Sequence, residues 1–127
     1  MKKLVILFFF IFSNLYASEI KLEKIVDGLK KPWSLSFIDQ KNIVITEKAG
    51  KLFILSLVDK KISEIKHNLS VLEDGQGGLL DVLYDKERIY ISYSENRSNW
   101  KTSTSVAKGK FNQKKLILKI FSEQNPQ

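Results

Sequence analysis

The chain has 127 residues, of which 43% are hydrophobic and 28% are charged, a balance typical of a folded globular protein rather than a disordered one. It contains no cysteine, which excludes disulfide bonds and lipoprotein attachment. The formal net charge is +7, but the basic residues are almost all lysines scattered between predicted strands, with no nucleic-acid motif among them. We therefore exclude nucleic-acid binding and expect a solvated, lysine-rich surface.

The N-terminus has the pattern of a secretory signal peptide. Lys2 and Lys3 form a short positive region, residues 4–12 are unbroken apolar sequence, and Ala17 is a small residue suited to cleavage. An uncleaved anchor helix is the alternative, but the apolar stretch is far short of the roughly 20 residues that span a bilayer. We predict a signal peptide at residues 1–17, export to the periplasm, and no stable membrane anchor after cleavage.

The mature chain, residues 18–127, has the pattern of an all-β protein. Apolar and polar residues alternate over residues 20–26, as in a half-buried strand. Short apolar stretches separated by turn signals follow, and no segment has helical periodicity. These stretches predict strands at residues 35–37, 43–45, 52–55, 62–65, 79–83, 89–93, 103–111 and 116–120.

The strands form a repeat. The unit that begins at Leu35 begins again 45 residues later at Leu80, and Ile43 recurs 46 residues later as Ile89. Four antiparallel strands recurring every 40–50 residues are typical of a propeller blade, with a two-sheet sandwich as the alternative. We predict blades at roughly residues 33–66 and 77–121, with residues 20–26 as a candidate ring-closing strand. Because two blades cannot close a ring, we expect an N-terminal part of a longer propeller.

Strand direction would sort the loops onto two faces. On one face we expect the charged hairpins at 39–42, 59–61, 85–88 and 112–114. The opposite face would carry the turn at 46–50, the glycine-rich stretch at 73–81 and a long polar loop at 94–101. Loops held by a rigid sheet often carry binding residues, so the second face is the candidate site.

The residues themselves do not define a reaction. His67 is the one histidine of the chain, and its polar setting predicts a surface turn residue. The adjacent acids Glu73 and Asp74 are expected to be solvated. The glycines at 75, 77 and 78 are not a phosphate loop, because neither phosphate-loop motif occurs and a strand follows them.

A resemblance to a known protein family suggests a function. Five motifs occur in order: GL followed by PWSLSF at 28–37, TEKAGKL at 46–52, GQGGLLDV at 75–82, IYISYS at 89–94 and SVAKGKF at 105–111. Together they resemble the PQQ-dependent soluble aldose sugar dehydrogenases, also called the glucose/sorbosone dehydrogenase family. Lysines such as Lys48 and Lys108 stand where that family usually has arginine.

The resemblance implies a six-bladed propeller with pyrroloquinoline quinone (PQQ) and calcium on its top face, and a histidine as general base. The enzyme would oxidise the C1 hydroxyl of an aldose to a lactone by hydride transfer to PQQ, with the electron acceptor left open. By its position in the motif, Gln76 matches the glutamine that faces the quinone and sugar. A primary amide suits that role because it can both donate and accept hydrogen bonds. Gly77 and Gly78 would let the backbone approach the cofactor.

The family's catalytic histidine and calcium ligands lie beyond Gln127, and His67 does not match the histidine. These residues alone are therefore expected to be an inactive fragment of an enzyme. The alternative is a non-catalytic exported propeller that binds sugars or partner proteins through its top-face loops.

Overall fold

The computed structural model describes residues 19–97, 101–111 and 115–123. All nine secondary-structure elements of these residues are strands, which confirms the prediction of an all-β chain. They are β1 (Pro32–Phe37), β2 (Asn42–Glu47), β3 (Lys51–Ser56), β4 (Lys61–His67), β5 (Leu79–Asp85), β6 (Arg88–Arg97), β7 (Lys101–Lys110), β8 (Lys115–Leu116) and β9 (Lys119–Glu123).

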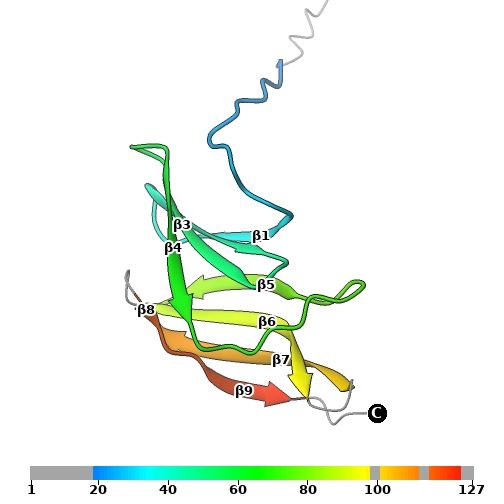
Figure 1. Ribbon diagram of the computed structural model, residues 1–127. Coiled ribbons are helices and arrows are strands. Elements are labelled where there is room, and N and C mark those ends of the chain that lie inside the picture. The colour runs from blue at the N-terminus through cyan, green and yellow to red at the C-terminus, as the bar shows by residue number, and fades with distance from the viewer. Residues whose placement is uncertain (1–18, 98–100, 112–114, 124–127) are drawn as a thin grey trace, which may run out of the picture.

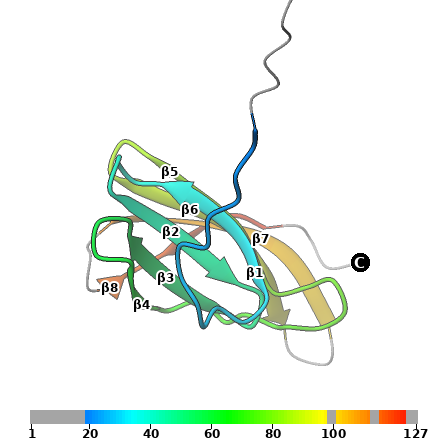
Figure 2. The same ribbon diagram turned by 90° about the horizontal axis from the view of Figure 1, so that it is seen from above.

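The strands form two sheets that lie one over the other (Figures 1 and 2). The first has the order β1-β2-β3-β4-β8, antiparallel except for the short parallel pairing of β8 with β4. The second has the order β5-β6-β7-β9 and is antiparallel throughout. Each sheet contains the antiparallel four-stranded unit of a propeller blade.

The last predicted strand, at 116–120, is wrong as a single element. β8 pairs with the first sheet and β9 with the second, so the chain crosses between sheets at residues 117–118. Gly109 makes this crossing possible, because a Cβ there would lie 2.5 Å from the Ile117 carbonyl oxygen. A local apolar pattern cannot show that one short stretch serves two sheets.

The core lies between the sheets. Alternate residues of each strand point inward, so both sheets contribute one apolar face. The fully buried side chains include Val44, Leu52 and Ile65 from the first sheet and Leu79, Ile89, Ile91 and Tyr93 from the second.

The inner strands β1 and β5 meet through side chains. β5 is the edge strand of the second sheet, so its outward N–H groups need partners from elsewhere. The Ser36 hydroxyl accepts the Tyr84 N–H at 3.0 Å, and the Ser34 hydroxyl accepts the Val82 N–H at 3.4 Å. From β2, the buried Thr46 hydroxyl donates to the Leu80 carbonyl oxygen at 2.7 Å.

The outer faces of the two sheets remain partly apolar. Val26 and Leu29 cover part of the first sheet, where they pack against Ile43, Ile45 and Leu55. Beside them, Leu35 and Phe37 of β1 stay 54% and 60% exposed. On the other outer face, Leu83 of β5 is 57% exposed.

The N-terminal predictions have different outcomes. Residues 20–26 form no strand in the structure, and Ile20 and Leu22 are 88% and 98% exposed, so the half-buried strand is not present. Their ring-closing role, which needs a further blade as partner, stays a prediction. The predicted signal peptide at 1–17 lies outside the described residues. Within the described residues, no helix is long and apolar enough to cross a membrane.

Candidate functional site

The unusual loops gather at the start of the inner strands. The Lys48 carbonyl oxygen, in the turn after β2, accepts the Leu79 N–H at 3.0 Å. The Gly78 carbonyl oxygen accepts the Ser94 N–H at 2.8 Å, and the Ser94 carbonyl oxygen accepts the Leu72 N–H at 2.9 Å. The turn at 46–50, the glycine stretch and Ser94 are therefore joined, as the strand directions predicted.

The predicted loop at 94–101 is mostly strand. β6 continues to Arg97 and β7 starts at Lys101, and they pair in register from Ser94 with Thr104 to Arg97 with Lys101. Residues 98–100 lie outside the described residues. The polar composition misled the prediction because the paired residues 94–97 are only half-buried or exposed, so the strand continues here by backbone pairing and without an apolar pattern.

Gly77 and Gly78 are required by packing within the chain. A Cβ on Gly77 would lie 2.7 Å from the Ser94 hydroxyl oxygen, and one on Gly78 would collide with the Lys48 carbonyl oxygen. Gly78 also has φ of 152°, a value that side chains rarely permit. The absence of a side chain at both positions is thus explained by contacts with Ser94 and Lys48 of the same chain. The predicted close approach of Gly77 and Gly78 to a cofactor stays a prediction.

Gln76 stands at the tip of a tight turn. Gly75 has φ of 50°, and the Gly77 N–H returns to the Asp74 carbonyl oxygen at 2.6 Å. The Gln76 side chain is exposed, and its amide makes no hydrogen bond to the described residues. An exposed amide on a braced turn can offer both a donor and an acceptor to a ligand.

Two lysines hold this turn. Lys48 Nζ donates to the Gly75 carbonyl oxygen and lies 5.5 Å from the ring centroid of Trp33. Lys31 Nζ lies 2.7 Å from Glu73 Oε1. The hydrogen bond from Lys31 lowers the pKa of Glu73, with smaller contributions from the charges of Lys31 and Lys48. Glu73 is therefore an ionised partner of a lysine, which corrects the expectation of a merely solvated acid.

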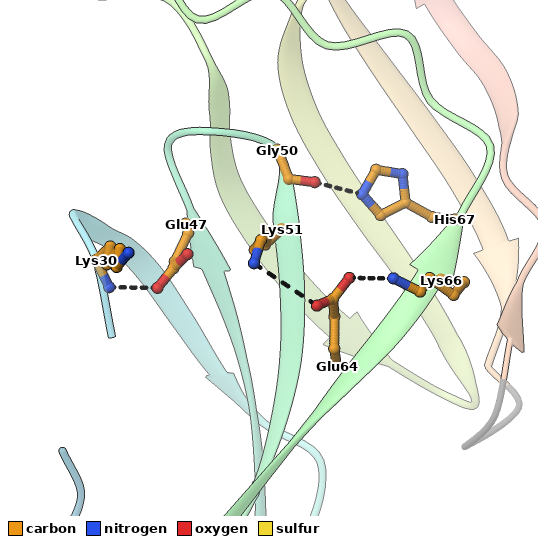
Figure 3. A network of polar contacts seen from close by, with 7 residues as sticks. All are labelled: Lys30, Glu47, Gly50, Lys51, Glu64, Lys66 and His67. Atoms are coloured by element: carbon orange, nitrogen blue, oxygen red, sulfur yellow. Dashed lines mark hydrogen bonds and ion pairs between the residues drawn. The ribbon is translucent and has the colours of Figure 1, made fainter. Parts of the chain in front are cut away.

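A buried carboxylate fixes the segment that carries Lys31. Glu47, only 3% exposed, accepts the Lys30 N–H (Figure 3). The Lys48 N–H donates to the Lys31 carbonyl oxygen at 3.1 Å, and Lys31 has φ of 50°. The residues that lead into β1 and into β5 are thus both hydrogen-bonded to the turn after β2. Sequence reasoning missed these contacts, although the TEKAG motif contains Glu47 and Lys48, and Lys30 and Lys31 come directly before the PW motif.

His67 is structural in this chain. It ends β4 and is half-buried, so the prediction of a surface turn residue is wrong. Its Nε2–H donates to the Gly50 carbonyl oxygen at 2.8 Å (Figure 3), and its Nδ1 accepts the Leu69 N–H at 3.2 Å. Both ring nitrogens are occupied, so His67 is not placed to act as a catalytic base.

Comparisons with known proteins agree with this geometry. Residues 29–126 match the family described as Glucose / Sorbosone dehydrogenase. Aldose sugar dehydrogenase YliI from Escherichia coli strain K12 is 32% identical over 97 residues, which cover 72% of this chain and 26% of that protein.

Solved structures match at similar levels. A crystal structure of a glucose dehydrogenase has a TM-score of 0.76 at 33% identity, covering 82% of this chain and 33% of that one. The apo-form of the soluble aldose sugar dehydrogenase from Escherichia coli has a TM-score of 0.73 at 30% identity, over 80% of this chain and 32% of that one. A PQQ-bound aldose sugar dehydrogenase from Streptomyces coelicolor has a TM-score of 0.71 at 14% identity, which supports the fold alone.

The fold defines a class: about two blades of a β-propeller of the sugar dehydrogenase type, with a glycine-rich loop at the start of an inner strand. The chain belongs to the Glucose / Sorbosone dehydrogenase family. It spans about a quarter of the length of the curated relative above and about a third of the solved chains.

Proposed function

We propose that this chain forms one wall of the cofactor and substrate site of a PQQ-dependent aldose dehydrogenase. The observation that carries the proposal is the exposed Gln76 amide on a turn braced by Lys48 and Lys31. When bound, PQQ would supply the acceptor for the hydride that leaves C1 of the aldose.

The residues present fit part of such a site. The Gln76 amide can bind a carbonyl and a hydroxyl at once without adding charge. The Lys48 ammonium on the Gly75 carbonyl oxygen places a positive charge next to it, which favours a cofactor with carboxylates such as PQQ, whereas the charge of Lys31 is balanced by Glu73. This chain's contribution is to bind and orient the ligands at one wall.

The remaining parts of the site are not among these residues. The described residues include no cluster of three or more His, Cys, Asp or Glu that could hold a metal ion. From the family resemblance alone, we propose that calcium and the general base are held at the family positions beyond Gln127. Export to the periplasm through the signal peptide belongs to the same proposal.

The test uses the whole protein that contains this chain, purified and supplied with PQQ, calcium, a panel of aldoses and a dye acceptor. We expect sugar-dependent dye reduction that disappears when PQQ is left out. The absence of dye reduction across a broad aldose panel would contradict the proposal. Sugar binding measured by calorimetry without any oxidation would instead favour the non-catalytic propeller.

A further inference from the structure

Lys48 occupies the point where the first blade touches the Gln76 turn. Its backbone is held on both sides, with its N–H on the Lys31 carbonyl oxygen and its own carbonyl oxygen accepting the Leu79 N–H. Its side chain then reaches the Gly75 carbonyl oxygen, one residue before Gln76. The backbone of Lys48 is therefore fixed at the end of β2, and its ammonium group contacts the glycine-rich turn at residues 75–78 from this fixed point.

The ring of Trp33 is the second contact of the Lys48 ammonium group. Trp33 lies at an irregularity of β1, between Pro32 paired with Glu47 and Ser34 paired with Thr46. Such irregularities re-aim a side chain, and Trp33 is left 46% exposed. The Lys48 ammonium lies 5.5 Å from the ring centroid, within the range of cation–π attraction.

The glycines explain why the turn needs an external contact. Glycine has more backbone freedom than other residues, so Gly75, directly before Gln76, would let the amide sample many orientations. Gly77 and Gly78 are fixed by inward packing, while a Cβ on Gly75 would meet nothing within 4 Å. The Lys48 hydrogen bond therefore falls on the least restrained side of Gln76.

We propose that Lys48 is a positioning residue, which orients the Gln76 amide by fixing the Gly75 carbonyl oxygen while Trp33 holds the ammonium group. The relevance of Lys48 to catalysis rests on the proposed function. The effect of Lys48 on the Gln76 turn can be tested independently, because it can be measured without substrate or cofactor.

The first readout is hydrogen exchange of the Gly77 backbone amide in the whole protein. Lys48→Met keeps an apolar side chain on Trp33 but removes the donor, and Lys48→Arg restores a charged donor. Lys51→Met is the matched control, since Lys51 lies on the same hairpin but its ammonium pairs with Glu64 at 3.8 Å. We expect Lys48→Met to speed exchange about tenfold at Gly77, whose N–H is protected by its bond to the Asp74 carbonyl oxygen, with Lys48→Arg and Lys51→Met close to wild type.

The second readout is affinity for PQQ and the split between kcat and KM for the sugar. We expect Lys48→Met to weaken PQQ binding about tenfold and Lys48→Arg to restore it. The unfolding midpoint of Lys48→Met should match wild type, because both backbone bonds of Lys48 remain.

Three results would overturn the inference: unchanged exchange at Gly77 in Lys48→Met, no rescue by Lys48→Arg, or a lower unfolding midpoint with faster exchange throughout both blades. If Lys48→Met does not fold, that result also assigns Lys48 a general stabilising role and overturns the inference. If the wild-type protein with PQQ reduces no dye, the proposed function fails, but the exchange comparison still decides the role of Lys48.

Discussion

The side chain of Asn68 binds the backbone of Leu118 as a neighbouring strand would. Its Nδ2 donates to the Leu118 carbonyl oxygen at 3.0 Å, and its Oδ1 accepts the Leu118 N–H at 2.8 Å. Asn68 follows β4 of the first sheet, and Leu118 is a buried residue at the crossing from β8 to β9. One amide therefore fixes the point where the chain passes between the blades.

Asn68→Asp should be clearly destabilising, because it replaces the donor to the Leu118 carbonyl oxygen with a second acceptor. We expect a loss of about 1–3 kcal/mol in the free energy of unfolding, the cost of an unsatisfied, partly buried group. Urea unfolding would measure it. Asn96→Asp makes the same chemical change at a side chain that forms no hydrogen bond to the described residues, and an equal loss in both variants would contradict the prediction.

Gly78→Ala should cost more stability than Gly75→Ala. Both glycines have positive φ, at 152° and 50°, but only at Gly78 would the new Cβ collide with the Lys48 carbonyl oxygen. We expect about 1–2 kcal/mol for Gly75→Ala from backbone strain alone, and a larger loss for Gly78→Ala. Thermal and urea unfolding of the two variants would test the order, and equal losses would exclude the steric explanation.

His67→Ala should destabilise the fold although His67 carries no catalytic role here. It leaves the Gly50 carbonyl oxygen and the Leu69 N–H without their present partner, in a half-buried position. We expect a loss of about 1–3 kcal/mol in the free energy of unfolding. The exposed neighbour Lys66 is the control, since Lys66→Ala should change it by no more than about 0.5 kcal/mol. Dye reduction per folded molecule should be unchanged in His67→Ala, and its loss would reopen a catalytic role.

The Lys31–Glu73 pair should make the order of the Gln76 turn depend on pH. The folded state lowers the pKa of Glu73 below its ordinary value of 4.5. The stabilising contribution is therefore fully present above pH 4.5 and is lost as pH falls through the lowered pKa. An NMR titration of the carboxyl group would measure this pKa, and Lys31→Met should raise it towards 4.5. No change in Lys31→Met would contradict the pairing.

Gln76→Ala should impair function without affecting stability. The side chain is exposed and makes no hydrogen bond to the described residues, so the unfolding midpoint should match wild type. On the proposed function, kcat/KM for the aldose should fall roughly 10- to 100-fold, the effect of losing one or two hydrogen bonds to the ligands. Gln40→Ala, at an exposed hairpin beside β1, is the control. Equal activity of the two variants would remove Gln76 from the site.

The sequence predicted the parts of the fold that repeat locally. Short apolar stretches between turn signals located the buried strands around Ile43–Ile45 and Leu52–Leu55, and the 45-residue offset between Leu35 and Leu80 separated the two sheets. It could not predict the parallel pairing of β8 with β4 or the bonds of Asn68 to Leu118, because these join residues about 50 positions apart with no local pattern.

At the candidate site, the sequence located Gln76 and the loops that gather around it. It did not give the reason for the adjacent glycines, because their constraint comes from the distant Lys48 and Ser94. The contacts of Lys48 and Trp33 were likewise hidden, since each residue alone is an ordinary surface lysine or aromatic residue. Their effect depends on a bend in β1 that no composition rule places.

The hydroxyls of Ser34 and Ser36 have a consequence for how the two blades stay distinct. By accepting the Val82 and Tyr84 N–H groups, they close an edge that could otherwise recruit a strand from another molecule. A direct backbone ladder between β1 and β5 would also close that edge, but it would merge the blades into one continuous sheet. Side-chain hydrogen bonds instead cap the edge of β5 and leave the two blades as separate sheets.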